Sequence, residues 1–240
     1  RPATLLQAAM LRLGFMTTPF VTGTWVTAAR GDTVVREVTL SDGRSTQTIR
    51  CDLLCAAFGL VPNTELARLL GCALENGAVA VDERQSTSVP GVYCCGEPTG
   101  IGGVDLALVE GEIAGHAAAA QTVPARLVSR RARHRRDAAR LERAFGLRAE
   151  LFALAESDTI VCRCEDVPWG ALDRQWSTRQ AKLYTRAGMG PCQGRVCGAA
   201  LECLMGWPPD SVRAPAQPAR CDTLIGRPSP NRLPSEQGVT

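Results

Sequence analysis

The chain has 240 residues, 45% of them hydrophobic, and a formal net charge of +3. A chain of this length can bury a substantial core in one large or two ordinary domains. So small a net charge gives no whole-chain reason to expect binding to nucleic acid or to an anionic membrane. No apolar run is long enough to span a membrane and the first residues lack the order of a signal peptide, so we expect a cytoplasmic protein.

The first sixty residues combine helical and strand patterns. Residues 4–13 carry apolar side chains at helical spacing and end at Gly14, which predicts a short helix. Residues 34–40 and 46–49 flank an Asp-Gly turn, which predicts a β-hairpin. Residues 52–58 form a nearly continuous apolar run, typical of a strand buried on both faces of a sheet.

The next sixty residues predict a strand, a glycine-rich turn and a helix in that order. We expect a helix over 64–70, strands over 78–81 and 91–96, glycines at 100, 102 and 103, and a helix over 104–120. Nucleotide-binding α/β folds build phosphate sites from this local order, although a glycine turn alone is equally typical of any tight turn before a helix. No Gly-x-Gly-x-x-Gly follows an N-terminal strand, and the chain begins at Arg1 within what reads as the middle of a domain. We therefore expect an N-terminal portion outside this sequence.

Two further segments differ from these elements in composition. Residues 126–148 hold ten arginine or histidine residues, with Ala138, Leu141 and Phe145 at helical spacing. This pattern predicts an amphipathic linking helix whose basic face is solvated, with a docking patch for an acidic partner or nucleic acid as the alternative. Seven of the fifteen prolines follow Gly206, so we expect an extended or disordered tail.

Cysteine is the most informative residue type in the sequence. Eleven cysteines are an odd number in a chain much larger than a disulfide-stapled scaffold, which favours metal or cluster ligation. Cys162 and Cys164 form a C-x-C pair, and after 27 residues Cys192 and Cys197 form a C-x4-C pair. Four soft thiolates in two close pairs suit a 2Fe-2S cluster, and the glycines at 188, 190, 194 and 198 let backbone N–H groups approach the sulfurs.

Two alternatives to the cluster remain open. A structural zinc site also takes four cysteines in two pairs, although its paired ligands usually have two to four residues between them rather than one. The same cysteines could also be unligated core residues, since cysteine is often a small buried hydrophobe.

The cysteine segment resembles a known family. The runs Thr159–Asp166 and Thr185–Gly198 resemble the ferredoxin module related to bacterioferritin-associated ferredoxin. They look most like the version at the C-terminus of the FAD-containing subunits of opine oxidase, hydrogen cyanide synthase and proline or hydroxyproline dehydrogenase complexes. The resemblance implies a 2Fe-2S cluster on Cys162, Cys164, Cys192 and Cys197, with module helices over 167–175 and 196–204.

A second resemblance covers residues 81–105. The run that ends in Gly96-Glu97, followed by Gly100-Ile101-Gly102-Gly103-Val104, resembles the second flavin motif of the two-dinucleotide-domain flavoproteins. In that family the strand ends in Gly-Asp, so Glu97 departs from the pattern, as it does in the opine-oxidase-like branch. The resemblance implies FAD binding at Gly96, Glu97, Gly102, Gly103 and Val104. A carboxylate can accept from ribityl hydroxyls, and free N–H groups at a helix start can serve anionic or carbonyl oxygens.

Other reactive side chains give no functional prediction. Cys51, Cys55, Cys72 and the adjacent pair Cys94-Cys95 are interpreted as packing residues, because an adjacent pair lacks the C-x-x-C spacing of a dithiol catalyst. Cys203 and Cys221 are not chosen as ligands. His116 and His134 have no visible catalytic partner, and the sequence identifies no catalytic residue.

The sequence therefore predicts an α/β fold: a partial two-dinucleotide-binding-domain flavoprotein fold followed by a small helical 2Fe-2S ferredoxin-like module. The expected divisions are 1–122 for the C-terminal part of the FAD/NAD(P)-binding domain, 123–156 for the linking helix, 157–206 for the cluster domain and 207–240 for the tail. The expected function is electron transfer between FAD and the cluster in an oxidoreductase acting on an amine or amino-acid-type substrate. By resemblance, the partner is a second flavin-containing subunit in a hetero-oligomer. A zinc-binding interaction module on a degenerate α/β domain and an inactive remnant are the alternatives.

Overall fold

The computed structural model describes residues 2–207 together with 212, 214, 219–221 and 225. The chain divides into two compact units, residues 1–58 and 59–240. Helices and sheets are mixed, as the sequence predicts, and the sheets of the described residues pair antiparallel. The division into domains at residues 122, 156 and 206 stays a prediction.

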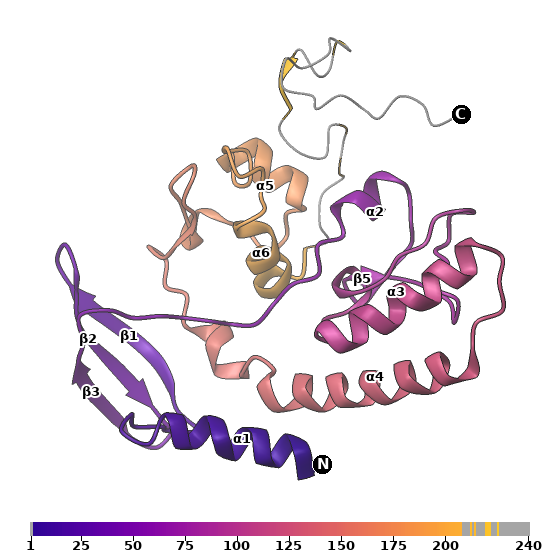
Figure 1. The fold of residues 1–240 in the computed structure, drawn as a ribbon. Helices are drawn as coiled ribbons and strands as arrows, with labels where there is room; N and C mark the ends of the chain where they lie inside the picture. Colours follow the sequence, from indigo (N-terminus) through magenta and orange to yellow (C-terminus); the bar gives the residue numbers. More distant parts are fainter. Residues whose placement is uncertain (1, 208–211, 213, 215–218, 222–224, 226–240) are drawn as a thin grey trace. The chain divides into compact units, whose positions relative to one another are not determined.

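The first unit consists of one helix and one three-stranded sheet (Figure 1). Helix α1 spans Pro2–Gly14, and strands β1 (Trp25–Gly31), β2 (Val35–Ser41) and β3 (Thr46–Arg50) follow in the order β1-β2-β3. The predicted helix and hairpin are confirmed, whereas the sequence gives no prediction of β1. The hairpin turn forms because Oδ1 of Asp42 accepts from the backbone N–H groups of Arg44 (2.8 Å) and Ser45 (2.7 Å).

The predicted buried strand over residues 52–58 is wrong. The segment has no strand structure and its residues are exposed; Leu53 and Phe58 are among the exposed large hydrophobic side chains. The last hydrogen bond to β2 is the one that the backbone N–H of Cys51 donates to the Arg36 carbonyl (3.1 Å). A strand requires a neighbour for its backbone groups, and none of the described residues supplies one here.

The second unit opens with short elements and then two long helices. Helix α2 (Glu65–Leu69), strands β4 (Leu74–Glu75) and β5 (Ala78–Val79), and the 3-10 helix η1 (Glu97–Thr99) precede α3 (Val104–Ala118) and α4 (Ala125–Phe145). The helices predicted over 64–70, 104–120 and 126–148 are confirmed, and the strand over 78–81 is present in part. The strand predicted over 91–96 is wrong, because Tyr93 makes only an isolated bridge with Ser86.

Helices α3 and α4 lie side by side and share the core of this region (Figure 1). Val109 and Ile113 of α3 and Leu127 of α4 are almost wholly buried, and Val123 packs against them from the connecting segment. The buried positions of α3 recur at helical spacing (Leu106, Val109, Glu110, Ile113, Ala114 and Ala117), and one of them is a glutamate.

The cysteine-containing segment has a core of its own. Its elements are η2 (Ala149–Ala153), β6 (Ile160–Cys162), β7 (Val167–Pro168), η3 (Trp169–Ala171), α5 (Thr178–Thr185) and α6 (Cys197–Met205). Its buried cluster consists of Cys162, Val167, Ala181, Ala187, Cys197, Leu201 and Trp207. Two of the four predicted ligands therefore belong to the core of the segment.

The helix predicted over 196–204 is confirmed as α6, but the helix predicted over 167–175 is wrong. The backbone N–H groups of Trp169 and Gly170 donate to the carbonyls of Thr159 (2.8 Å) and Ser157 (2.8 Å), so these residues close a hairpin with β6. The helix begins later, at Thr178, where Ser177 and Gln180 form a capping box.

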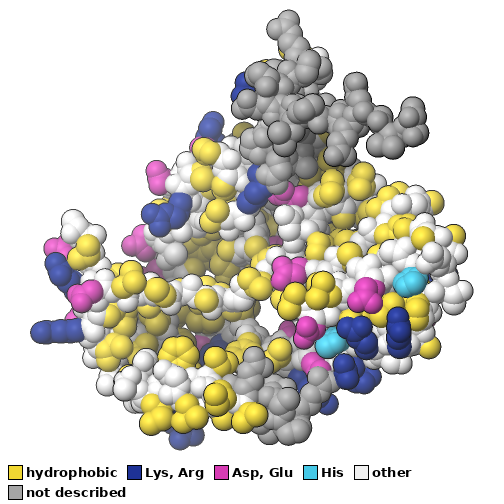
Figure 2. All heavy atoms as spheres, in the orientation of Figure 1, with side chains coloured by type: hydrophobic (Ala, Val, Ile, Leu, Met, Phe, Trp, Pro, Cys, Tyr) yellow, Lys and Arg dark blue, Asp and Glu magenta, His cyan; other side chains and the backbone are white. Residues whose placement is uncertain are grey.

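Most of the tail predicted to be extended lies outside the described residues. In the part of the chain that the structure describes, no helix combines the length and the apolar character that crossing a membrane requires. On the face that Figure 2 shows, hydrophobic side chains are widely exposed. Among the large hydrophobic residues, Leu60, Val61 and Leu66 are each at least 65% exposed.

Replacement of Ile113 by alanine tests the shared core of α3 and α4. Ile113 is fully buried, so Ile113→Ala is expected to lower the free energy of unfolding of this unit by about 3 kcal/mol through lost apolar contacts and a cavity. Leu108→Ala on the same helix is the control, because Leu108 is 60% exposed and should change stability by less than about 0.5 kcal/mol. Urea unfolding followed by circular dichroism measures both; equal effects would contradict the described packing.

Candidate flavin and cluster sites

The predicted flavin residues lie on one continuous turn that leads into α3. This turn, residues 96–103, is called the glycine loop below. It contains η1 and ends at Gly103, the N-cap of α3, where no side chain caps the helix. The first N–H groups of α3, beginning at Val104, are therefore available to a ligand oxygen.

Gly96 is the position where the loop requires glycine. It is buried, with φ 76° and ψ −152°, a conformation that L side chains rarely adopt. A Cβ at this position would lie 3.3 Å from the Cβ of Ala107, so a side chain would also be tightly packed against α3. At Gly102 a Cβ would collide with the side chain of Leu106. The glycines thus allow the loop to pack directly against α3.

Glu97 is exposed, and its carboxylate makes no hydrogen bond or ion pair within the described residues. The loop is held by its neighbours instead: the Thr99 hydroxyl donates to the Gly96 carbonyl (2.8 Å), and the backbone N–H of Gly100 donates to the Glu97 carbonyl (3.0 Å). A carboxylate without a protein partner on a fixed turn is well placed to accept hydrogen bonds from hydroxyl groups of a ligand.

A small cavity of about 120 Å³ lies beside this loop, lined by Asn63, Leu66, Ala67, Leu70, Cys72, Thr87, Val92, Tyr93, Cys94 and Pro98. Pockets for cofactor-sized ligands are typically several times larger. The cavity is mainly apolar, and Cys72 and Cys94 contribute to its lining.

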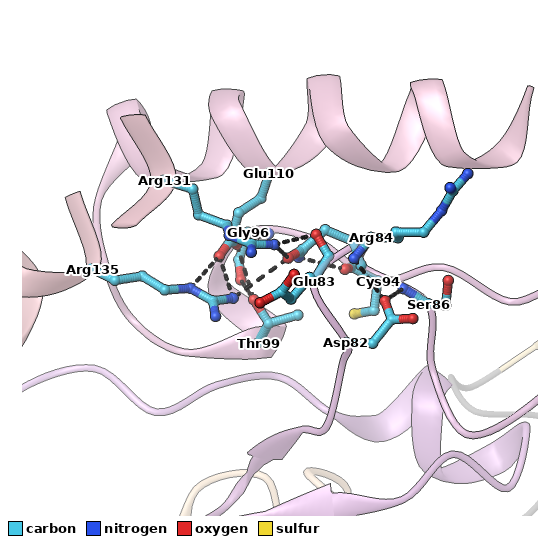
Figure 3. Close-up of polar contacts among 11 residues, drawn as sticks. Asp82, Glu83, Arg84, Ser86, Cys94, Gly96, Thr99, Glu110, Arg131 and Arg135 are labelled. Carbon is cyan, nitrogen blue, oxygen red and sulfur yellow. Dashed lines mark hydrogen bonds and ion pairs between the residues drawn. The ribbon is translucent and has the colours of Figure 1, made fainter. Parts of the chain in front are cut away.

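Glu110 of α3 is a buried charged residue beside the glycine loop that the sequence analysis does not single out. Its side chain is only 1% exposed, yet both carboxylate oxygens are hydrogen-bonded (Figure 3). Oε2 accepts from the backbone N–H of Gly96 (3.0 Å) and from the Thr99 hydroxyl (3.0 Å), and Oε1 accepts from Nε (3.1 Å) and Nη2 (2.7 Å) of Arg135. The available signal was a glutamate at an apolar position of the α3 pattern, since buried charges require partners.

A second arginine of α4 contacts the segment before the glycine loop. Arg131 is 6% exposed, and its Nη1 donates to the Glu83 carbonyl (2.6 Å) and to Oε1 of Gln85 (3.2 Å). Gln85 is fully buried, and its Nε2 donates to the Cys94 carbonyl (2.9 Å). Burial lowers the pKa of the Arg131 guanidinium, and the neighbouring charge of Arg135 lowers it further. The interpretation of α4 as a solvated basic face is therefore wrong for the buried Arg131, whereas Arg135 is exposed but also bonded to the buried Glu110.

The four predicted ligands lie on two turns. Cys162 ends β6, Cys164 lies on the β6–β7 turn, Cys192 precedes α6 and Cys197 begins it. Cys162 and Cys197 are buried, Cys192 is half-buried and Cys164 is exposed. Side-chain hydrogen bonds join Cys164 with Cys192 and Cys162 with Cys197. The structure thus brings the four cysteines together as two thiol pairs, and each pair has one cysteine from each turn.

Backbone and side-chain contacts hold these two turns together. The backbone N–H of Gly188 donates to Sγ of Cys162 (3.4 Å), and Nε of Arg186 donates to Oε2 of Glu165 (2.6 Å). A Cβ at Gly190 would collide with Cβ of Cys164, so only glycine allows this approach. The Arg186 hydrogen bond lowers the pKa of Glu165, so the carboxylate that joins the turns stays ionised.

Within the residues that the structure describes, no set of three or more His, Cys, Asp or Glu side chains is arranged to hold a metal ion. The four cysteines nevertheless lie near one another: Cys164 is influenced by Cys192 and Cys162, and Cys197 by Cys162 and Cys192. Four thiols, two from each turn, fit the donor set of a 2Fe-2S cluster, which uses four cysteine thiolates.

The cysteines outside the predicted cluster differ in their exposure to solvent. Cys72 is buried, as expected of a packing residue, and Cys51 and Cys94 are half-buried. The packing interpretation is wrong for Cys55 and Cys95, which are exposed. Nδ1 of His116 lies 3.0 Å from Oε1 of Gln121, so this histidine has a local structural partner.

An ion pair links the cluster segment to α2. Nε of Arg195, within the C-x4-C turn, lies 2.9 Å from Oε1 of Glu65, and Nη2 lies 3.0 Å from Oε2. The two parallel contacts have the fork geometry that guanidinium and carboxylate groups prefer.

Comparison with known proteins identifies the class of the first half of the chain. Residues 6–122 match the family model described as pyridine nucleotide-disulphide oxidoreductase. This part of the chain therefore carries an FAD/NAD-binding oxidoreductase domain of that family, and the glycine loop falls within it.

Individual relatives extend the similarity beyond that domain. The chain is 31% identical over 209 residues to the hydrogen cyanide synthase component HcnB of Pseudomonas aeruginosa, an alignment covering 75% of this chain and 45% of the relative. It is 35% identical over 164 residues to an opine oxidase subunit of Rhizobium meliloti, covering 61% of this chain and 36% of the relative. A shorter match, 43% over 60 residues, is to a nitric oxide reductase FlRd-NAD(+) reductase of Aeromonas salmonicida and covers 25% of this chain and 14% of the relative. The chain thus spans less than half the length of these curated relatives.

The two thiol pairs predict different reactivities for Cys192 and Cys197 in the metal-free chain. Burial raises the pKa of Cys197 to about 11, so roughly one thiol in a thousand is ionised at pH 8. The backbone N–H of Val196 lowers the pKa of Cys192 below its ordinary value, so a larger fraction is thiolate at the same pH. Because the thiolate is the nucleophile, iodoacetamide at pH 8 should label Cys192 much faster than Cys197, as read by peptide mass spectrometry. The two should react alike in the urea-unfolded chain; equal rates in the folded chain would contradict the described environment.

Proposed function

We propose that the chain is the electron-handling part of an FAD-dependent oxidoreductase subunit, in which Cys162, Cys164, Cys192 and Cys197 ligate a 2Fe-2S cluster. The observation that carries the proposal is the approach of four cysteines from two turns as two thiol pairs. The oxidoreductase domain over residues 6–122 supplies the flavin context.

The pairing favours two irons over one zinc ion. A structural zinc ion takes its four thiolates around a single centre, whereas the four thiolates of a 2Fe-2S cluster are divided between two irons. Two thiol pairs that lie near each other suit the second requirement. Each pair would supply one iron: the exposed Cys164 with Cys192, and the buried Cys162 with Cys197.

The flanking residues support a cluster in this position. The Gly188 N–H already donates to the Cys162 sulfur, and such bonds stabilise a thiolate ligand and tune the potential of a cluster. The Glu165–Arg186 ion pair keeps the two turns together. The Arg195–Glu65 ion pair then attaches the second turn to α2, on the side of the flavin domain.

FAD, when bound, would supply two-electron oxidation chemistry, and a 2Fe-2S cluster would pass electrons one at a time. The residues of the chain would bind and orient the cofactor. Glu97 would accept hydrogen bonds from ribityl hydroxyls, and Gly102, Gly103 and Val104 would present N–H groups at the start of α3. Gly96 fixes the turn from which Glu97 projects.

The relatives suggest the setting of the reaction. Two of them are named as subunits, one of hydrogen cyanide synthase and one of opine oxidase. From these names we propose that the chain works in a hetero-oligomer with a second flavin-containing subunit, on an amine or amino-acid-type substrate. A cytoplasmic location stays a prediction.

Replacement of a single ligand tests the cluster. Cys192→Ser should lose most of the bound iron and the visible absorption of the purified protein, because one iron would lack a thiolate. Cys203→Ser is the matched control, since Cys203 is an exposed cysteine on α6 outside both pairs. Iron and zinc analysis with an absorption spectrum measures both variants. Equal iron in the two variants, or stoichiometric zinc in the wild type, would contradict the assignment.

Replacement of Glu97 tests the flavin site. Glu97→Gln removes the charge that strengthens hydrogen bonds from ribityl hydroxyls, and the dissociation constant for FAD should rise about tenfold. Glu75→Gln is the control, because Glu75 is an exposed carboxylate on β4, away from the loop in sequence. Titration of FAD fluorescence measures the change; identical dissociation constants for both variants and wild type would remove Glu97 from the site.

A further inference from the structure

The Glu110 carboxylate joins the glycine loop to α4 (Figure 3). We propose that Arg135 of α4 is a positioning residue for the flavin site and acts through Glu110 on the loop that carries Glu97. The inference rests on the proposed FAD site. In this proposal, α4 has the role of holding the glycine loop in place.

The buried carboxylate requires a positive partner. Glu110 is 1% exposed, and an ionised carboxylate removed from water is strongly disfavoured unless it is paired and fully hydrogen-bonded. Arg135 supplies the pairing with two donors, Nε at 3.1 Å and Nη2 at 2.7 Å, both to Oε1. The guanidinium is itself 43% exposed, so it reaches from the surface of α4 to the buried charge.

The other carboxylate oxygen faces the loop. Oε2 accepts from the backbone N–H of Gly96 at 3.0 Å and from the Thr99 hydroxyl at 3.0 Å. These residues stand immediately before Glu97 and two residues after it. A carboxylate fixed on one side by Arg135 therefore fixes the turn on both sides of Glu97.

A second contact from the same face of α4 supports this interpretation. Arg131 lies one helical turn before Arg135 and donates to the Glu83 carbonyl and to Gln85, which in turn donates to the Cys94 carbonyl. Nη2 of Arg135 also donates to Oε1 of Gln85 at 3.4 Å. Helix α4 is thus bonded both to the segment that enters the glycine loop and, through Glu110, to the loop itself.

The test compares arginines on the same helix. In Arg135→Gln, Glu110 is left buried without its cation, so the loop should open more often. Hydrogen exchange in peptides covering residues 94–103 should become about tenfold faster, and the dissociation constant for FAD should rise about tenfold. Arg133→Gln is the matched control: Arg133 is exposed on α4, makes no contact with Glu110, and should match wild type in both readouts.

A charge-matched double variant separates positioning from general destabilisation. Glu110→Gln combined with Arg135→Gln removes the buried charge together with its partner, while an amide oxygen stays to accept from Gly96. Its loop exchange should return most of the way to wild type. Should Arg135→Gln fail to fold, Arg135→Lys decides the question. Faster loop exchange than wild type would support the proposal, and unchanged exchange would overturn it.

Three results overturn the inference: loop exchange in Arg135→Gln equal to wild type, equal effects of Arg133→Gln and Arg135→Gln, or an unchanged FAD dissociation constant despite faster loop exchange. Absence of FAD binding by the wild-type chain would instead count against the proposed flavin function. The exchange experiment needs no cofactor, so in that case it still decides whether Arg135 positions the loop.

Discussion

The carboxyl side chain of Glu110, buried between α3, α4 and the glycine loop, is the constraint on which the geometry of this region depends. A buried carboxylate must be surrounded by donors, and here the donors come from segments far apart in sequence: Gly96 and Thr99 on one side, Arg135 on the other. Satisfying one charge therefore determines both the path of the loop and the docking of α4. The apolar contacts of Val109, Ile113 and Leu127 supply the adjoining core.

The cysteine segment has a separate core, and part of it is made of the proposed ligands. Two of its proposed ligands, Cys162 and Cys197, are themselves core residues, whereas Cys164 is exposed. The glycines of the second turn allow its backbone to approach the first turn closely. Of the four proposed ligands, the exposed Cys164 would therefore lie nearest to solvent.

Several arginines along the chain join segments that are distant in sequence. The arginine-rich composition of residues 126–148 suggested a solvated face, yet Arg131 and Arg135 point inward and neutralise or cap polar groups of the flavin region. Arg186 and Arg195 similarly join turns of the cysteine segment to each other and to α2. In each case the guanidinium serves as a connector between segments, for which its several fixed donors suit it.

The sequence by itself determined the local features: α1, α3, α4 and α6, the hairpin around Asp42, the spacing of the four cysteines and the residues of the glycine loop. Helical periodicity, turn chemistry and motif spacing are local, so one segment is sufficient to identify them. Tertiary structure decided the rest. Residues 52–58 and 91–96 have strand-like composition but lack a paired strand. Residues 167–170 bond to β6 and the residues before it instead of forming an α-helix, and the proposed role of Glu110 depends on an arginine 25 positions away. Hydrogen bonds between distant segments leave no periodic trace in the sequence, because the partner of a buried charge or a strand is chosen only when the chain folds.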